Sequence, residues 1–243
     1  MFMKTTHQKI LDVTFIALFA ALCYIALTVF FIPFANMYIH FGNMIVVLAA
    51  LLVGGWQGGL AGSVGMGLYD ILGGHIDSAP KTFVLKLLIG LATGIVYALL
   101  AKRKKYPAVP LYISGVISLM VASGLLVYTL VKNNAYTGEG AILSPIFFVI
   151  GIFCIVFGLL KNKFSHKTAA AIVGASCGML VNIVGETAWK FVSYVIAGSA
   201  PQAAFVTAVL GQASTLINAG IAIAGGVALF CALEKPFSKI LGK

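Results

Sequence analysis

The sequence predicts an all-α integral membrane protein. The 243-residue chain is 61% hydrophobic and 9% charged, whereas soluble domains are about 45–50% apolar and about 25% charged. Too few polar side chains are present to cover a globule in water. Apolar runs separated by short polar breaks repeat along the chain, and a spanning helix needs roughly 20 apolar residues. These observations predict one transmembrane domain, residues 1–243, of about eight helices.

The breaks between apolar runs give the order of the expected helices. The first run ends at Pro33, and the fourth ends at a cluster of four basic residues, 102–105. Proline and basic residues are typical of the ends of spanning helices. The second and third runs are shorter than a span, so either can be tilted, broken or re-entrant. The runs are 10–32, 43–53, 58–72, 83–101, 108–131, 142–160, 168–196 and 204–233.

Basic residues predict the orientation of these helices. Lys and Arg favour the cytoplasmic side of short loops. With the N-terminus inside, 12 of the 16 basic residues fall in inner segments, and an even number of spans returns the C-terminus to the same side. We therefore expect both termini to be cytoplasmic in a multi-pass protein of the cell membrane. Topology and attraction to anionic lipids then explain the net charge of +10, and no nucleic-acid partner is expected.

Small residues spaced four apart indicate which helices pack closely, because Gly and Ala let helix backbones approach in a bilayer. Such pairs concentrate in the first, third, fourth and seventh runs, which predicts a compact bundle of those helices. The fifth and sixth runs have fewer. We expect them to form an inserted two-helix hairpin, about 105–162, beside core helices in 10–101 and 168–233. The pairs are Ala17/Ala21, Gly55/Gly59, Gly58/Gly62, Gly90/Gly94 and Gly174/Gly178.

Polar side chains inside the expected spans are the candidates for a binding site, because each is costly there and usually faces the bundle interior or a cavity. In the seventh run they recur every four residues and so share one helix face. The eighth run carries Gly211, Thr215, Asn218 and Ala222 in a similar stripe, with Gln212 beside it. The third run ends in Tyr69 and Asp70, and the fourth carries Lys86. The seventh-run candidates are Asn182, Glu186, Lys190 and Tyr194, with Trp189 beside them.

The alternating direction of the helices brings these polar groups to one level. The third and seventh runs travel outward, and the fourth and eighth travel inward. The inner half stays apolar, which predicts a pocket open to the outside and not a continuous pore. The residues expected in the outer part are Asp70, Lys86, Glu186, Lys190 and Gln212, with Asn182 and Asn218 nearer the middle.

Each candidate also has a purely structural interpretation. Glu186 suits an intrahelical ion pair with Lys190, four residues later. Asp70 and Lys86 suit an ion pair between helices. The two asparagines suit interhelical hydrogen bonds, and the aromatic residues suit the membrane interface. The case for a binding site therefore rests on the shared level of these residues.

Motifs for catalysis or tightly held metals are absent from the sequence. There is no phosphate-binding loop, no His-Glu-x-x-His helix and no Gly-x-Ser-x-Gly elbow. The four cysteines lie in spans without paired spacing and are expected to be packing residues. His40 lies in an outer loop, and a metal site of His40, Asp70 and His75 is a minor alternative. We expect no cofactor and no metal, and a partner ATPase to drive import.

Six short segments, in this order, carry a family resemblance: IHFGN (39–43), VVLAALLVGG (46–55), GGLAG to GMGLYD (58–70), APKTF with Lys86 (79–86), GMLVN (178–182) and LGQ (210–212). They resemble the S components of energy-coupling factor (ECF) transporters, which are membrane subunits that bind vitamins and related micronutrients. The similarity is closest to the riboflavin-transporter-like group, a name that does not fix the substrate.

The resemblance implies a six-helix bundle with an outward-facing pocket formed by the fourth to sixth helices and outer loops. It also implies that Ala17 and Ala21, on the first helix, contact a membrane coupling subunit, and that two ATPase subunits complete the importer. The expected hairpin at about 105–162 departs from the six-helix pattern.

We therefore expect a substrate-binding subunit of an ECF-type ABC importer, without enzyme activity, that captures a vitamin or related small micronutrient. Aromatic candidates would stack on a flat ring, amides would read its hydrogen-bonding edge, and charged residues would match its charge or hold the pocket. Alternatives are a membrane-embedded enzyme with Glu186 or Asp70 as general base, and a structural or regulatory membrane partner. The substrate-binding candidates are Asn182, Glu186, Trp189, Lys190, Tyr194, Gln212, Asn218, Lys86, Asp70, Tyr69 and His40.

Overall fold

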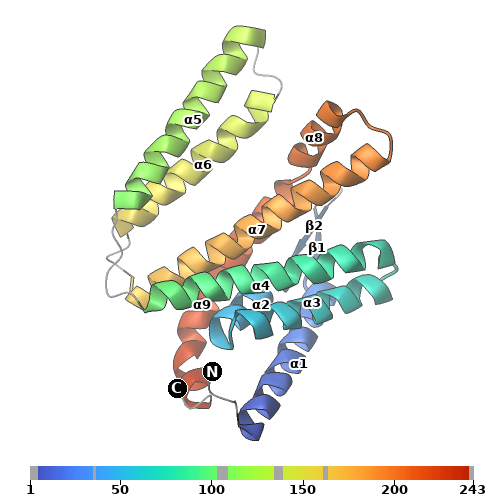
Figure 1. Ribbon diagram of the computed structural model, residues 1–243, viewed down its shortest axis with the longest axis vertical. Coiled ribbons are helices and arrows are strands. Elements are labelled where there is room, and N and C mark those ends of the chain that lie inside the picture. Colours follow the sequence, from blue (N-terminus) through green and yellow to red (C-terminus); the bar gives the residue numbers. More distant parts are fainter. Residues whose placement is uncertain (1–4, 35–36, 103–108, 134–138, 161–163, 241–243) are drawn as a thin grey trace. The chain divides into compact units, whose positions relative to one another are not determined.

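The computed structural model describes residues 5–34, 37–102, 109–133, 139–160 and 164–240. Within these ranges the regular structure is almost entirely helical (Figure 1). The chain divides into two compact units. The first, here called the core unit, comprises Met1–Lys102, Ala170–Trp189 and Gln212–Lys243, and the second, the hairpin unit, comprises Arg103–Ala169 and Lys190–Gly211.

Most elements belong to the core unit. These are α1 (Thr6–Thr28), β1 (Phe31–Phe34), β2 (Met37–His40), α2 (Gly42–Leu52), α3 (Gly55–Leu72), the 3₁₀ turn η1 (Ile76–Ser78), α4 (Ala79–Ala101), the middle of α7 (His166–Ile196) and α9 (Ala213–Ile240). The hairpin unit holds α5 (Val109–Asn133), α6 (Glu139–Leu160), α8 (Pro201–Leu210) and the two ends of α7.

The all-α membrane fold class is confirmed. Four helical stretches of the described chain are long and apolar enough to cross a membrane: Thr6–Thr28, Ile76–Ala101, His166–Ile196 and Ser214–Ile240. Shorter apolar helices accompany them, α2 and α8 among them. The number of spans and the side of each terminus stay predictions.

The first helix ends four residues earlier than the apolar run predicted. It stops at Thr28, and Phe31–Phe34 pairs antiparallel with Met37–His40 instead. Pro33 has no N–H group and disfavours helical geometry at the residue before it. Aromatic and β-branched neighbours also fit a strand. This short β-hairpin was not expected from the sequence.

The eighth apolar run does not form the single helix predicted over 204–233. Helix α8 ends at Leu210, and α9 begins at Ala213. The N–H group of Gly211 still bonds to the Thr207 carbonyl, which closes the last turn of α8. Glycine is among the weakest helix formers, so the helix is interrupted at a residue of low helix propensity. The predicted continuous stripe from Gly211 to Ala222 was therefore wrong.

Close backbone contact between α3 and α4 confirms two of the predicted small-residue pairs. A Cβ atom on Gly55 would lie 2.8 Å from the Gly90 carbonyl oxygen, and one on Gly94 would overlap the Gly55 backbone. A Cβ on Gly90 would likewise overlap the backbone of Gly59. The two helices therefore cross where neither carries a side chain.

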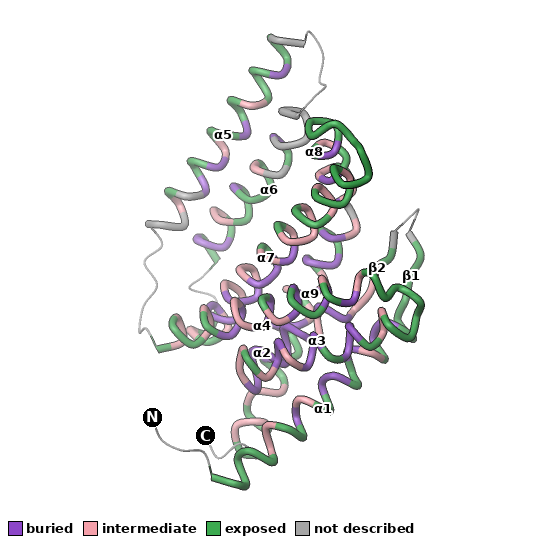
Figure 2. Tube along the Cα trace, turned by 45° about the vertical axis from the view of Figure 1, so that its right-hand side comes forward, coloured by how far each residue is buried: buried purple, intermediate pink, exposed green. Residues whose placement is uncertain are grey.

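The pair Gly174 and Gly178 brings α7 onto α4 in the same way. A Cβ on Gly174 would lie 2.7 Å from the Thr93 carbonyl oxygen, and one on Gly178 would overlap the Thr93 side chain. Figure 2 shows the buried positions (purple) that run along α2, α3 and α4 of the core unit. The pocket candidates on α4 and α7 are therefore carried by helices that are held at close range.

Helix α1 packs against α3 without using Ala17 and Ala21. A Cβ on Gly65 would overlap the Ala20 backbone, and Cys23 is fully buried beside it. Ala17 and Ala21 lie on the exposed face of α1. These two small side chains are not covered by the residues that the structure describes.

The hairpin unit is built on a close contact between α5 and α6. A Cβ on Gly115 would lie 3.1 Å from the Gly151 carbonyl oxygen, and the Ser118 hydroxyl donates to the Phe147 carbonyl at 2.7 Å. The fifth and sixth apolar runs thus form two paired helices.

Candidate functional site

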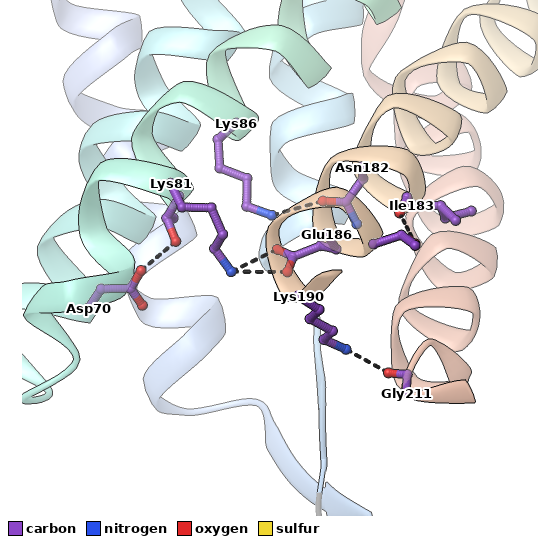
Figure 3. A network of polar contacts seen from close by, with 10 residues as sticks. Asp70, Lys81, Lys86, Asn182, Ile183, Glu186, Lys190 and Gly211 are labelled. Atoms are coloured by element: carbon purple, nitrogen blue, oxygen red, sulfur yellow. Dashed lines mark hydrogen bonds and ion pairs between the residues drawn. The ribbon is translucent and has the colours of Figure 1, made fainter. Parts of the chain in front are cut away.

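An ion pair joins α4 to α7 inside the core unit. The Lys81 ammonium lies 3.1 and 3.0 Å from the two carboxylate oxygens of Glu186 (Figure 3). Both side chains are largely buried, with 17% and 18% exposed. Lys81 was not among the predicted site residues, although its place in the first turn of α4 puts it at the level of Glu186.

A second contact between the same helices lies deeper. The Lys86 ammonium donates a hydrogen bond to the Asn182 side-chain oxygen at 3.1 Å. Lys86 is 4% exposed and Asn182 is 2% exposed, so this amide meets a buried cation. The sequence placed both residues in the candidate pocket, and the structure brings them into contact. Figure 3 shows Lys81 and Lys86 projecting from α4 toward Glu186 and Asn182 on α7.

Asp70, at the end of α3, accepts a hydrogen bond from the Thr82 hydroxyl on α4. The sequence suggested an ion pair between Asp70 and Lys86 as one interpretation. In the described part of the chain, the direct polar partners of these two residues are Thr82 and Asn182. The Lys86 ammonium is thus held by a neutral amide.

Asn218 of α9 binds the backbone of strand β2. Its side-chain oxygen accepts from the His40 N–H at 3.0 Å, and its side-chain nitrogen donates to the Tyr38 carbonyl at 3.0 Å. Both polar groups of the amide are therefore used within the protein. This geometry favours the structural interpretation of Asn218 and fixes the β-hairpin to α9.

Two polar atoms near the start of α2 lack partners in the part of the chain that the structure describes. These are the Nδ1 atom of His40 and the side-chain oxygen of Asn43, and both are buried. Asn43 is 2% exposed. The sequence analysis did not include Asn43 among the site residues, although a lone amide side chain at the start of an apolar helix could have identified it.

The His40 side chain is held neutral. Burial, aided by the positive charge of Lys86, lowers the pKa of His40 to about 4, from an ordinary value of 6.5. Neutral imidazole has one donor nitrogen and one acceptor nitrogen. His40 therefore remains uncharged at neutral pH.

We expect the folded protein to lose stability as the pH falls from about 6.5 to about 4. His40 is neutral in both states above this window, and within it the unfolded chain binds the proton first. Each pKa unit corresponds to about 1.4 kcal/mol, so the full effect is on the order of 3 kcal/mol. Thermal unfolding in detergent across this range measures it. His40→Asn should flatten the slope, and an unchanged slope contradicts this assignment.

Three other candidates belong to the core unit and differ in their exposure and contacts. Trp189 is 43% exposed, as an interfacial aromatic would be. Tyr69 makes an edge-to-face contact with Tyr24, with ring centroids 6.3 Å apart. Gln212 is 3% exposed. The stacking and reading roles of these residues stay predictions.

Two candidates fall in the hairpin unit. The Lys190 ammonium donates to the Gly211 carbonyl oxygen at 2.6 Å, at the end of α8. This contact suits a helix C-terminus, where carbonyl groups carry partial negative charge. Tyr194 lies one turn further along α7 and is partly buried.

An open apolar groove of about 480 Å³ lies along α3 and α4 but contains none of the candidates. Its lining includes Val64, Leu68, Ile76 and Phe83. The Ser63 hydroxyl, also in the lining, donates a hydrogen bond to the Phe83 carbonyl oxygen at 2.6 Å. Such a surface suits lipid contact. Within the described residues, no three His, Cys, Asp or Glu side chains gather as metal ligands, which argues against the site of His40, Asp70 and His75.

Comparison with known proteins adds a family. A family model described as ECF-type riboflavin transporter, S component, matches residues 7–146, more than half of the chain. The match extends through α5 into α6, and so includes part of the segment expected as an insertion. No curated protein and no solved structure matches the chain.

Proposed function

This chain belongs to the family of S components of ECF-type riboflavin transporters, and from that premise we propose that it captures a vitamin or related small micronutrient from outside the cell. Membership makes it a multi-pass membrane protein and the substrate-binding subunit of a transporter, not an enzyme. The substrate and the course of transport belong to the proposal.

The observation that carries this proposal is the buried polar cluster between α3, α4 and α7. Intramembrane charges are rare and mark substrate or ion pathways when they converge. Here Lys81, Lys86 and Glu186 project toward one another in an otherwise apolar unit. Stability alone does not explain such a cluster, since a buried ion pair often stabilises a fold no more than apolar side chains of similar volume.

The pocket is proposed to open to the outside. If the N-terminus is cytoplasmic, as the basic residues indicate, then α3 and α7 end on the outer side and α4 begins there. Asp70, Lys81 and Glu186 then lie in the outer part of the membrane. The β-hairpin, which Asn218 fixes to α9, follows the proposed outer end of α1 and is proposed to form an outer wall of the pocket.

A direct test is to identify what the protein holds. The full chain is purified gently in mild detergent, and bound small molecules are released and analysed by mass spectrometry. We expect a small, water-soluble, vitamin-like compound at close to one molecule per protein. A preparation that holds no such compound and binds none from a vitamin panel contradicts the proposal.

The partners proposed for transport are an ECF membrane coupling subunit and two ATPase subunits. The exposed small face of α1 supports this role for Ala17 and Ala21, because small side chains allow close helix approach in a bilayer. Import against a gradient then draws its energy from ATP hydrolysis in the partners.

Enlarging the α1 face is expected to separate transport from binding. Ala17→Leu with Ala21→Leu should lower uptake at least tenfold in cells that carry the coupling and ATPase subunits. Substrate affinity of the purified variant should stay within twofold of the unmodified protein. Leu22→Phe, which enlarges an exposed side chain on a different face of α1, serves as the control. Full uptake by the double variant contradicts the docking role.

A further inference from the structure

We propose that the ligand of this site is an anion, and that Lys86 binds its negatively charged group while Asn43 and His40 accept a hydrogen bond from the same molecule. This inference rests on the proposed function, because it names the chemical class of the substrate. It also adds Asn43 to the site.

Lys86 has unused capacity to bind. A lysine ammonium has three N–H donors, and the hydrogen bond of Lys86 in the described part of the chain is the one to Asn182. At 4% exposed, the ammonium has little access to bulk water. A buried charge is costly unless it is paired and hydrogen-bonded. The Lys86 ammonium therefore lacks part of the hydrogen bonding that a buried cation requires.

The other charges of the cluster already have direct partners. Lys81 contacts both carboxylate oxygens of Glu186, and Asp70 accepts from Thr82. The two carboxylates act on Lys86 through the field of the cluster, and its hydrogen-bond acceptor is the neutral Asn182. An anionic oxygen from a ligand would supply the missing direct partner.

The two buried atoms without partners add a second requirement, since the Asn43 oxygen is an acceptor and His40 Nδ1 is one in the tautomer that carries its proton on Nε2. His40 Nδ1 and the Asn43 oxygen lie three residues apart in sequence, where β2 leads into α2. A Cβ atom on Gly62 would lie 2.5 Å from the Val46 side chain of α2 and 3.4 Å from the Cβ atom of Lys86, so the first turns of α2 pack beside Lys86. The charges of Lys86 and Glu186 both act on His40. A molecule with an N–H or O–H donor beside its anionic group would satisfy both sets of atoms.

The combined pattern identifies a class of ligand. Two free donors on a cation favour a carboxylate or another anionic oxygen pair, and the nearby acceptors favour an amide, ring N–H or hydroxyl. A small vitamin-like carboxylic acid has both features. A cation would be repelled by the Lys86 ammonium, and a neutral molecule would supply no anionic oxygen to its free N–H donors.

Binding measurements on the full chain test the class directly. The probes are matched pairs that differ in charge, namely biotin and biotin amide, pantothenate and pantothenol, and nicotinate and nicotinamide, with neutral riboflavin added. We expect one acid to bind at least tenfold more tightly than its neutral partner and than riboflavin. Any compound that co-purifies with the protein is likewise expected to be an anion.

Two substitutions connect the result to Lys86. Asn182→Asp keeps the size and the oxygen that holds Lys86 but supplies a carboxylate, so the anionic ligand should lose at least tenfold in affinity while the variant stays folded. Lys86→Gln should give a similar loss, and Lys239→Gln, at an exposed position, none. If Lys86→Gln does not fold, Asn182→Asp decides the question.

The outcomes separate this inference from the proposed function. Tight binding of a neutral or cationic compound, unchanged in Asn182→Asp, overturns the anionic class and assigns Lys86 to structure, while the transporter role stands. A protein that binds no small molecule at all overturns the proposed function and this inference together.

Discussion

Gly90→Ala is expected to prevent the core unit from folding. The added methyl group would overlap the Gly59 backbone where α3 and α4 cross, and backbone atoms cannot turn aside as a side chain can. Overpacking in a well-packed interior costs about 1–3 kcal/mol and occasionally more. Here the two helices would have to separate, and the charged contacts of α4 with α7 would move with them. We expect little monodisperse protein after size-exclusion chromatography.

Gly220→Ala is the matched control for this substitution. A Cβ atom at Gly220 in α9 meets no other atom within 4 Å, and alanine favours a helix over glycine by about 1 kcal/mol. The control should fold with an unchanged or higher midpoint of thermal unfolding. A Gly90→Ala protein with the midpoint of the unmodified chain would show that α3 and α4 do not cross as described.

Asn182→Ala is expected to lower ligand affinity about 5- to 150-fold. The alanine removes the buried amide that is proposed to read the ligand, and so leaves a buried ligand group without its hydrogen-bond partner in the complex. Leaving a buried polar group unpaired costs about 1–3 kcal/mol, and each 1.4 kcal/mol is a factor of ten in affinity. A titration of the purified variant with the co-purifying compound measures the change.

Two further variants assign the cause of this loss. Trp189→Ala should also weaken binding if the exposed ring stacks on the ligand, and an interfacial tryptophan should leave affinity unchanged. Val184→Ala, at an exposed position of α7, should leave both affinity and stability near those of the unmodified protein. Thermal unfolding runs alongside each titration. Unchanged affinity in both Asn182→Ala and Trp189→Ala would remove α7 from the site.

The close helix contacts could be predicted from the sequence because they depend on residue size and helical spacing alone. Gly55 with Gly59 and Gly90 with Gly94 lie four apart, so each pair opens one face of its own helix. No long-range information is needed to identify such a face. The partner of each face, in contrast, came only from the structure.

The pairing of charges could not be predicted because it depends on the rotation and depth of separate helices. Glu186 has Lys190 one turn away in sequence, yet an ion pair joins it to Lys81 on α4. Lys86 and Asp70 occupy neighbouring helices, yet they bond to Asn182 and Thr82. A shift of one residue along α4 would have changed these partners.

The β-hairpin and the helix break depend on short segments that hydrophobicity alone does not resolve. Residues 29–34 continue the apolar character of α1, and Pro33 marks only a boundary. The break at Gly211 lies within an apolar run in the same way. Apolar character indicates burial in lipid or protein, whereas local backbone geometry decides between strand, turn and helix.

The bond from Asn218 to β2 has a consequence for how this protein can change in evolution. The amide forms hydrogen bonds with main-chain atoms of residues 38 and 40, and these atoms are the same for every amino acid other than proline. Side chains of the hairpin can therefore be exchanged without detaching it from α9. With the hairpin as a wall of the proposed pocket, substrate preference and anchoring would be encoded at different positions, and new preferences could arise on the hairpin while its attachment to α9 stays unaltered.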